Sequence, residues 1–124
     1  MTADGFGEEV REVGEVAIIR LQGKLRLGAA TQSVRELVSE LLERGRTSVI
    51  LELKDLNYID SAGLGTLMAC YTSARSRGGN LKLLSPSGRV RDQLLMMKLM
   101  PVFEVFEEES TAVSSFAKAA GTAS

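Results

Sequence analysis

The chain lacks histidine and tryptophan and contains one cysteine, Cys70, among its 124 residues. Without histidine, the general base of most serine hydrolases is missing, and a transition-metal site would need to be built mostly from carboxylates. A lone cysteine cannot form an internal disulfide. Because Cys70 falls inside an apolar helical pattern, we expect a buried free thiol in a reducing compartment.

The chain also lacks an excess of either charge, since 15 Lys and Arg against 16 Asp and Glu leave a net charge of -1. Nucleic-acid binders usually carry a basic excess, so no nucleic acid is expected as a partner. The apolar runs are too short to span a bilayer, and residues 1–5 do not have the pattern of a signal peptide. We therefore expect one cytoplasmic domain over residues 1–124, with an ordered core over about residues 10–117 and short flexible termini, including residues 1–8.

Hydrophobic periodicity predicts alternating strands and helices. Strands are expected over residues 10–13, 16–21, 47–53, 81–84 and 102–106, and helices over residues 30–44, 61–77, 86–100 and 110–120. Gly14-Glu15 indicates a tight hairpin turn, residues 22–28 and 54–59 indicate loops, and Ser85-Pro86 indicates a helix start. This order predicts an α/β fold with a small, mostly parallel sheet of four to five strands and about four helices.

The segment Asp60-Ser61-Ala62-Gly63-Leu64-Gly65 opens the second predicted helix. The first N–H groups of a helix lack intrahelical partners and carry the positive end of its dipole, so a phosphate on Ser61 would be stabilised there. The alternative is that Ser61 is an ordinary N-cap. A nucleophilic serine is disfavoured, because D-S-A-G-L-G is not the G-x-S-x-G pattern of a nucleophile elbow.

Three other features have both a structural and a functional interpretation. Gly63 and Gly65 lower the helix propensity of this segment, so another requirement must account for them. Close packing is preferred over a nucleotide-binding loop, because the glycine motifs of such loops are absent. For residues 107–109, three consecutive glutamates, a solvated turn is preferred over a Ca²⁺ or Mg²⁺ site. For Met96, Met97 and Met100, core packing is preferred over an adaptable partner surface. No metal and no cofactor is expected.

The thirteen residues Leu53–Gly65, read as LKDLNYIDSAGLG, resemble the signature of STAS domains, specifically of bacterial anti-sigma factor antagonists. The resemblance extends from about Val10 to Phe116. It includes Leu21-Gln22-Gly23, the Gly78-Gly79 pair before a strand, and Ser85-Pro86 at the third predicted helix. It implies a STAS-type domain that binds other proteins and has no catalytic activity.

In this family, the serine that aligns with Ser61 is phosphorylated by a serine kinase that is also the anti-sigma factor. The unphosphorylated protein binds that kinase and so releases the sigma factor. The resemblance therefore implies phosphorylation at Ser61, reversal by a phosphatase, and no contact with a membrane, in a monomer or weak dimer. The residues implied at the partner surface are Asp60, Ser61, Ala62, Gly63, Leu64, Gly65, Lys24 and Arg26.

The chain departs from the family pattern at Gly23-Lys24-Leu25-Arg26, where many members have the acidic Gly-Glu-Leu-Asp. This loop is expected to lie close to Ser61, so Lys24 and Arg26 would change the charge that the partner meets. Arg26 could pair with a phosphate on Ser61, or both cations could simply be solvated. The alternatives to the antagonist role are a stressosome-like scaffold and a cytoplasmic subunit of a lipid transporter; nucleotide binding near Ser61 is a third, weaker alternative.

Overall fold

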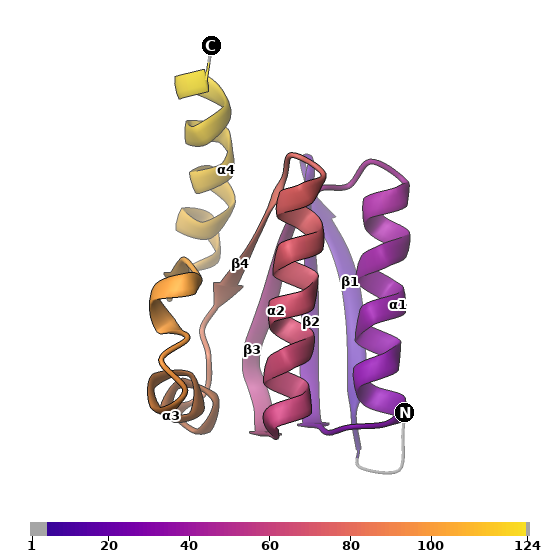
Figure 1. Ribbon diagram of the computed structural model, residues 1–124. Coiled ribbons are helices and arrows are strands. Elements are labelled where there is room, and N and C mark those ends of the chain that lie inside the picture. The colour runs from indigo at the N-terminus through magenta and orange to yellow at the C-terminus, as the bar shows by residue number, and fades with distance from the viewer. Residues whose placement is uncertain (1–4, 124) are drawn as a thin grey trace.

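Strands and helices alternate along the chain once the first hairpin has closed (Figure 1). The computed structural model describes residues 5–123, and their side chains through residue 116. Over this range the elements are β1 (Gly7–Val13), β2 (Val16–Leu25), α1 (Ala29–Glu43), β3 (Ser48–Ile59), α2 (Ser61–Ser76), β4 (Asn80–Leu84), α3 (Gly88–Met96), the short 3-10 helix η1 (Met100–Val102), β5 (Val105–Phe106) and α4 (Glu109–Ala123). The described strands form one five-stranded sheet in chain order, antiparallel between β1 and β2 and parallel thereafter. The predicted α/β class and mostly parallel sheet are confirmed.

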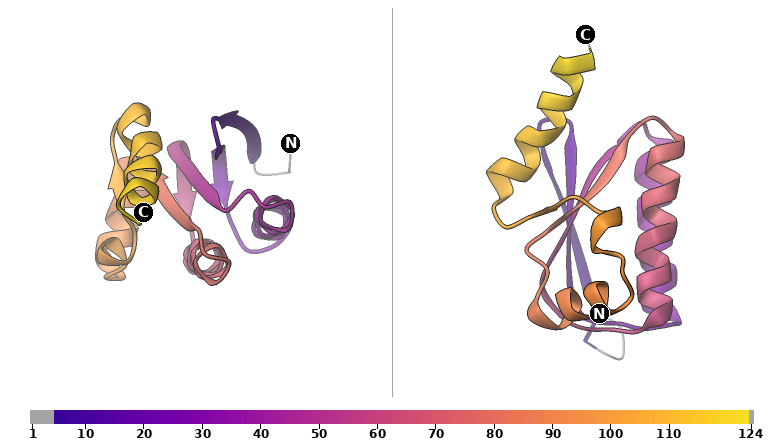
Figure 2. Two further views of the ribbon diagram at one scale, coloured as in Figure 1. Left: turned by 90° about the horizontal axis from the view of Figure 1, so that it is seen from above. Right: turned by 60° about the vertical axis from the view of Figure 1, so that its left-hand side comes forward.

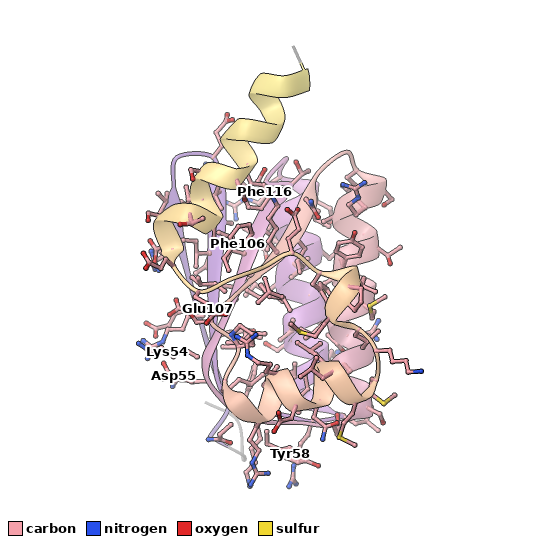
Figure 3. The ribbon with its side chains drawn as sticks, turned by 90° about the vertical axis from the view of Figure 1, so that its left-hand side faces the viewer. Lys54, Asp55, Tyr58, Phe106, Glu107 and Phe116 are labelled. Atoms are coloured by element: carbon pink, nitrogen blue, oxygen red, sulfur yellow. The ribbon has the colours of Figure 1, made fainter. Side chains whose placement is uncertain are left out.

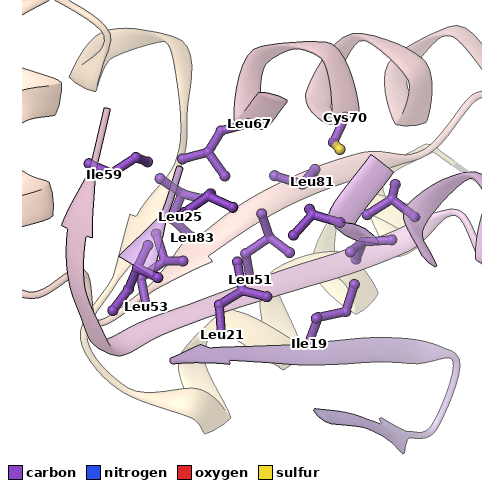
Figure 4. Packing of buried hydrophobic residues seen from close by; sticks show 14 of the residues in the cluster. Ile19, Leu21, Leu25, Leu51, Leu53, Ile59, Leu67, Cys70, Leu81 and Leu83 are labelled. Carbon is purple, nitrogen blue, oxygen red and sulfur yellow. The ribbon is translucent and has the colours of Figure 1, made fainter. Parts of the chain in front are cut away.

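The sheet lies between helices α1 and α2 on one face and α4 on the other (Figure 2). An apolar cluster is buried on each face. Helices α1 and α2 run side by side over one face and bury the larger core cluster, part of which Figure 4 shows. Helix α4 covers part of the other face, where Ile18, Ile50 and Ala112 belong to a smaller cluster. Because both faces are covered, Val16–Ile19 is buried at every position, which explains its continuous apolar sequence.

The first hairpin closes at Gly14, whose φ of 61° favours glycine, as the sequence predicted. Strand β1 begins at Gly7, earlier than expected. Phe6 is 2% exposed and belongs to the core, so the prediction of a flexible start is wrong for this part of residues 1–8. Residues 1–4 of that prediction lie outside the described residues.

One predicted loop, residues 54–59, is strand in the structure, and the other, residues 22–28, is strand through Leu25 and a loop only over residues 26–28. β2 continues to Leu25 and β3 to Ile59, and the two remain paired in parallel through Leu25 and Ile59. Register shifts occur between Arg20 and Gln22 and between Gly23 and Lys24. The extra residues lie in β3, where such bulges interrupt the alternation of apolar and polar residues, whereas the loop predicted at residues 22–28 rests on Gly23 and Gly28. The longer strands carry the chain directly to the start of α2.

The third helix begins later than Ser85-Pro86 predicted. Its N-cap is Ser87, whose Oγ accepts from the Val90 N–H at 3.4 Å and donates to the Leu56 carbonyl at 2.6 Å. Ser85 instead has a φ of 49° in the connection from β4, and the buried Pro86 follows it. The contact between Ser87 and β3 therefore determines where the helix starts, and this contact cannot be predicted from the local sequence.

The same helix ends earlier than predicted, at Met96, because Lys98 turns the chain with a φ of 58°. The Leu99 N–H then closes the end by donating to the Leu94 carbonyl at 2.8 Å. The predicted strand over residues 102–106 is reduced to β5, since η1 occupies its beginning. The last helix is confirmed and extends to Ala123. None of the described helices is both long and apolar enough to cross a membrane.

Candidate functional site

The junction between β3 and α2 places Ser61 at the first residue of the helix, where its side chain is exposed. Asp60, not Ser61, is the N-cap: the Gly63 N–H donates to Asp60 Oδ1 at 2.7 Å. The N-cap interpretation of Ser61 is therefore wrong. Because Asp60 satisfies a first-turn donor, the exposed Ser61 hydroxyl is not needed for capping.

Asp60 also joins two parts of the chain that are distant in sequence. The Leu27 N–H donates to Asp60 Oδ2 at 3.1 Å, and the Asp60 N–H donates to the Leu25 carbonyl at 3.4 Å. These bonds hold the connection between β2 and α1 against the start of α2. The predicted closeness of the Lys24–Arg26 segment to Ser61 is thereby confirmed.

The two basic residues of this segment lie around Tyr58. The Arg26 guanidinium lies 5.0 Å from the centre of the Tyr58 ring, a distance typical of a cation–π contact. Lys24 is the register partner of Tyr58 across β2 and β3 and is half-buried. Arg26 is exposed but stacked, so the expectation of two merely solvated cations is wrong for Arg26.

The two glycines of the signature have different structural roles. A Cβ on Gly63 would lie 2.6 Å from both the Leu25 carbonyl oxygen and Ile59 Cγ1, whereas a Cβ on Gly65 would meet nothing within 4 Å. Close packing therefore explains Gly63 but not Gly65. Leu64 is buried in the core, so it and Gly63 support the turn from inside. Ser61 and Gly65 are exposed, and Ala62 is half-exposed.

The structure adds residues that the sequence analysis missed. Tyr58, Ile59, Arg89 and Gln93 line a cleft of about 80 Å³ between the end of β3 and α3. Figure 3 shows Tyr58 at the end of the molecule where α3 lies. The i, i+4 spacing of Arg89 and Gln93 was a usable signal, but only knowledge of the α3 position could connect it with Ser61.

The methionine cluster does not follow the preferred interpretation. Met96 and Met97 are largely exposed, and only Met100 packs partly against the core. Met96 and Met97 lie at the end of α3, where the chain turns at Lys98 with a φ of 58°.

The acidic run does not form a metal site within the described residues, where no group of three potential ligands is close enough. Instead, Glu107 pairs with Arg91 at 2.5 Å, and Glu109 accepts from Arg11 Nη1 at 2.8 Å. The hydrogen bond from Arg11 lowers the pKa of Glu109. Cys70 is buried, as predicted, and burial raises the pKa of its thiol to about 11. A neutral buried thiol is a poor nucleophile.

Comparisons with known proteins agree with this geometry. A family model described as the STAS domain matches residues 9–112. An anti-sigma F factor antagonist of Paenibacillus polymyxa is 30% identical over 93 residues, covering 72% of this chain and 79% of the relative. The anti-sigma factor antagonist SpoIIAA in its unphosphorylated form is 25% identical, with a TM-score of 0.77 over 88% of this chain and 95% of the other.

The Bacillus cell fate determinant SpoIIAA in the phosphorylated form is also 25% identical, with a TM-score of 0.71 over 88% of this chain and 98% of the other. The residues that the family model matches run from β1 into α4 and include the whole junction around Asp60 and Ser61. On the family match and the shared fold together, the chain belongs to the STAS domain family.

Proposed function

We propose that this protein is an anti-sigma factor antagonist that binds a serine-kinase anti-sigma factor and is switched off by phosphorylation of Ser61. The observation that carries the proposal is the exposed Ser61 side chain at the first residue of α2, next to a cap supplied by Asp60. Anti-sigma factor antagonists of the STAS family are regulatory binding proteins and not enzymes. The proposed switch accordingly acts on binding.

The structural neighbours support the proposal that the fold accepts such a modification. SpoIIAA is described in both unphosphorylated and phosphorylated forms, and both resemble this chain over 88% of its length. In this chain, a phosphate on Ser61 would lie at a helix N-terminus, where the dipole favours an anion. We therefore expect the free protein to keep its fold after phosphorylation.

The same phosphate would oppose a partner. It adds about 1.5 to 2 negative charges and extra volume to a surface where the neighbouring residues, Ala62 and Gly65, are small. Enclosing that charge beside the Asp60 carboxylate would require desolvation and would set like charges together. Binding should fail for this local reason while the fold is unchanged. Arg26 could then hold the phosphate in the free protein.

The proposal includes a kinase that modifies Ser61, a phosphatase that reverses the modification, and a cytoplasmic location. The free protein is proposed to be a monomer or a weak dimer. Because Lys24 and Arg26 lie beside Ser61, the kinase must accept positive charges next to the serine that it modifies.

The experiment is phosphorylation by the host's candidate anti-sigma serine kinases with ATP, measured by intact mass. We expect one phosphate on the wild type and none on Ser61→Ala, with Ser73→Ala, exposed farther along α2, behaving as wild type. In a binding assay, Ser61→Ala should retain the kinase and Ser61→Asp should lose it. Equal binding by these two variants, or a stable ATP-independent complex with non-kinase proteins, would contradict the proposal and favour the scaffold or transporter alternative.

A further inference from the structure

The end of α3 exposes three consecutive large apolar side chains. Leu95, Met96 and Met97 have 56%, 74% and 55% of their surface exposed, whereas Val90 and Leu94 earlier in the same helix are fully buried. Contiguous exposed apolar groups are costly in water and typically mark a surface that another molecule covers. Methionine suits such a surface because its flexible thioether adapts to a partner.

These methionines continue a stripe that begins beside the phosphorylation site. Arg89, Gln93, Met96 and Met97 follow the i, i+4, i+7, i+8 spacing of one helix face. At the start of the stripe, Arg89 and Gln93 line the cleft with Tyr58 and Ile59. Since Ile59 directly precedes Asp60 and Ser61, the stripe leads from Ser61 to the exposed end of α3.

The two ends of this stripe differ in charge. Around the cleft lie Lys24, Arg26 and Arg89, with Arg26 stacked on Tyr58. The Asp60 carboxylate, directly before Ser61, accepts two backbone N–H groups, so part of its charge is already compensated. Asp92 is the only acidic residue of α3. The cleft end therefore carries mainly cations, and the Met96 end is apolar apart from the exposed Lys98 that follows Met97.

We propose that the kinase partner covers this α3 surface, defined as Arg89, Gln93, Met96 and Met97 together with Tyr58 and Arg26, in the same contact that covers Ser61. The partner then presents carboxylates to the cleft and apolar side chains to the methionines. This inference rests on the proposed function and specifies the chemistry of its partner. A second copy of the chain fits less well, because most of the charges around its own cleft are cations.

The proposal also explains how the switch would act on this partner. A phosphate on Ser61 would be close to the cations of the cleft and would compete with the partner's carboxylates for them. It would at the same time repel those carboxylates. Phosphorylation of Ser61 thus weakens the attraction between the cleft and the partner's carboxylates and adds a repulsion between them.

The test measures the affinity and association rate of the wild type and three variants for the kinase that phosphorylates the protein. Arg89→Glu reverses the charge at the cleft, and the double variant Met96→Ser with Met97→Ser removes the apolar end. Arg44→Glu is the matched control, since Arg44 is exposed at the C-terminal end of α1. At 1.5 Å per residue, the length of α1 separates it by about 20 Å from Leu27, which precedes the helix. Circular dichroism verifies that each variant is folded.

We expect each α3 variant to bind at least about tenfold more weakly than the wild type, the scale at which central interface residues matter. Arg89→Glu should also lose much of the salt dependence of the association rate. Arg44→Glu should bind as the wild type does.

The outcomes separate this inference from the proposed function. Wild-type affinity in both α3 variants, with binding still lost in Ser61→Asp, would overturn the α3 surface and leave the proposed function standing. A wild type that binds no kinase would overturn both. A dimer of the free protein that the double methionine variant dissociates would show that a second copy occupies the surface, which also overturns the inference.

Discussion

Gly63 and Gly65 differ by two positions in the same helical turn, yet only one of them has no room for a side chain. A Cβ at residue 63 would approach the Leu25 carbonyl oxygen to 2.6 Å, and that atom belongs to backbone that cannot move aside freely. We predict that Gly63→Ala destabilises the protein by about 1–3 kcal/mol, the typical cost of overpacking. Urea unfolding followed by circular dichroism measures this.

Gly65→Ala is the matched control for Gly63→Ala. Its Cβ would lie in open space, and alanine favours a helix over glycine by about 0.8–1.0 kcal/mol. We therefore expect Gly65→Ala to raise the free energy of unfolding. If both variants shifted stability in the same direction, the contact at Leu25 would not be the reason for Gly63.

Cys70 provides a second residue-level prediction. Burial raises the pKa of its thiol to about 11, against about 8.5 in an unfolded chain. Between these values the unfolded chain loses the proton and the folded one keeps it, so Cys70 stabilises the fold below about pH 8.5 and this contribution disappears as the pH rises through 11. Iodoacetamide should label the thiol slowly in buffer at pH 8 and rapidly in urea. Equal rates would indicate an accessible thiolate.

At the residue level, the sequence predicted the helix start at Ser61 but not the role of each side chain around it. The pattern around Ser61 predicted a helix start correctly, because glycine, serine and aspartate are informative there. Asp60 caps the helix with an extended backbone (φ -101°, ψ -177°), and the sequence could not distinguish it from Ser61 because both residue types are good caps. Tyr58 and Arg89 were missed because their proximity is created by the packing of α3 on β3.

Among the elements, the start of α2 depends most on one side chain. The two Asp60 oxygens accept from Gly63 within the helix and from Leu27 in the preceding connection. We predict that Asp60→Ala lowers the free energy of unfolding by about 1–2 kcal/mol, the upper range for loss of an N-cap. Hydrogen exchange should quicken at the amides of both Gly63 and Leu27.

Asp60→Asn distinguishes the two bonds. Asparagine is a good N-cap, but its amide carries one acceptor oxygen and a donor group in place of the second oxygen. We expect Asp60→Asn to retain protection at Gly63 and lose it at Leu27. Loss of protection at Gly63 alone would contradict the assignment of the cap.

The elements with strong periodicity were predicted well, and those shaped by contacts were not. Helix α1 has a clear apolar face and a glycine stop, so its bounds were predicted within a residue or two. The bulges in β3, where the extra residues of both register shifts lie, concealed the strands that continue to Leu25 and Ile59. The end of α3 was misplaced because a non-glycine residue, Lys98, adopts the left-handed conformation there.

At the scale of the whole molecule, one sheet carries two separate apolar clusters. The larger lies under α1 and α2, and the smaller lies under α4 on the opposite face. Lys82 is 3% exposed on the α4 side, where its Nζ donates to Ser115 Oγ at 2.8 Å and lies 4.3 Å from the centre of the Phe116 ring. Figure 3 shows Phe116 on α4 and Phe106 close by. The attachment of α4 thus depends on one buried cation, a few apolar contacts and the ion pair between Arg11 and Glu109 at the start of the helix.

This arrangement predicts that α4 can open without the rest of the fold. Phe116→Ala removes a half-buried ring from the smaller cluster and from Lys82, and we expect a loss of about 2 kcal/mol, below the 3–5 kcal/mol typical of fully buried phenylalanine. Hydrogen exchange followed by mass spectrometry should show faster exchange in α4, with α1 and α2 unchanged under native conditions. Because Ser61 lies on α2, Ser61 phosphorylation should proceed in this variant as in the wild type. Uniformly faster exchange across all helices would instead mean that both clusters unfold as one unit, since the loss would then lower the stability of the whole sheet and not only the attachment of α4.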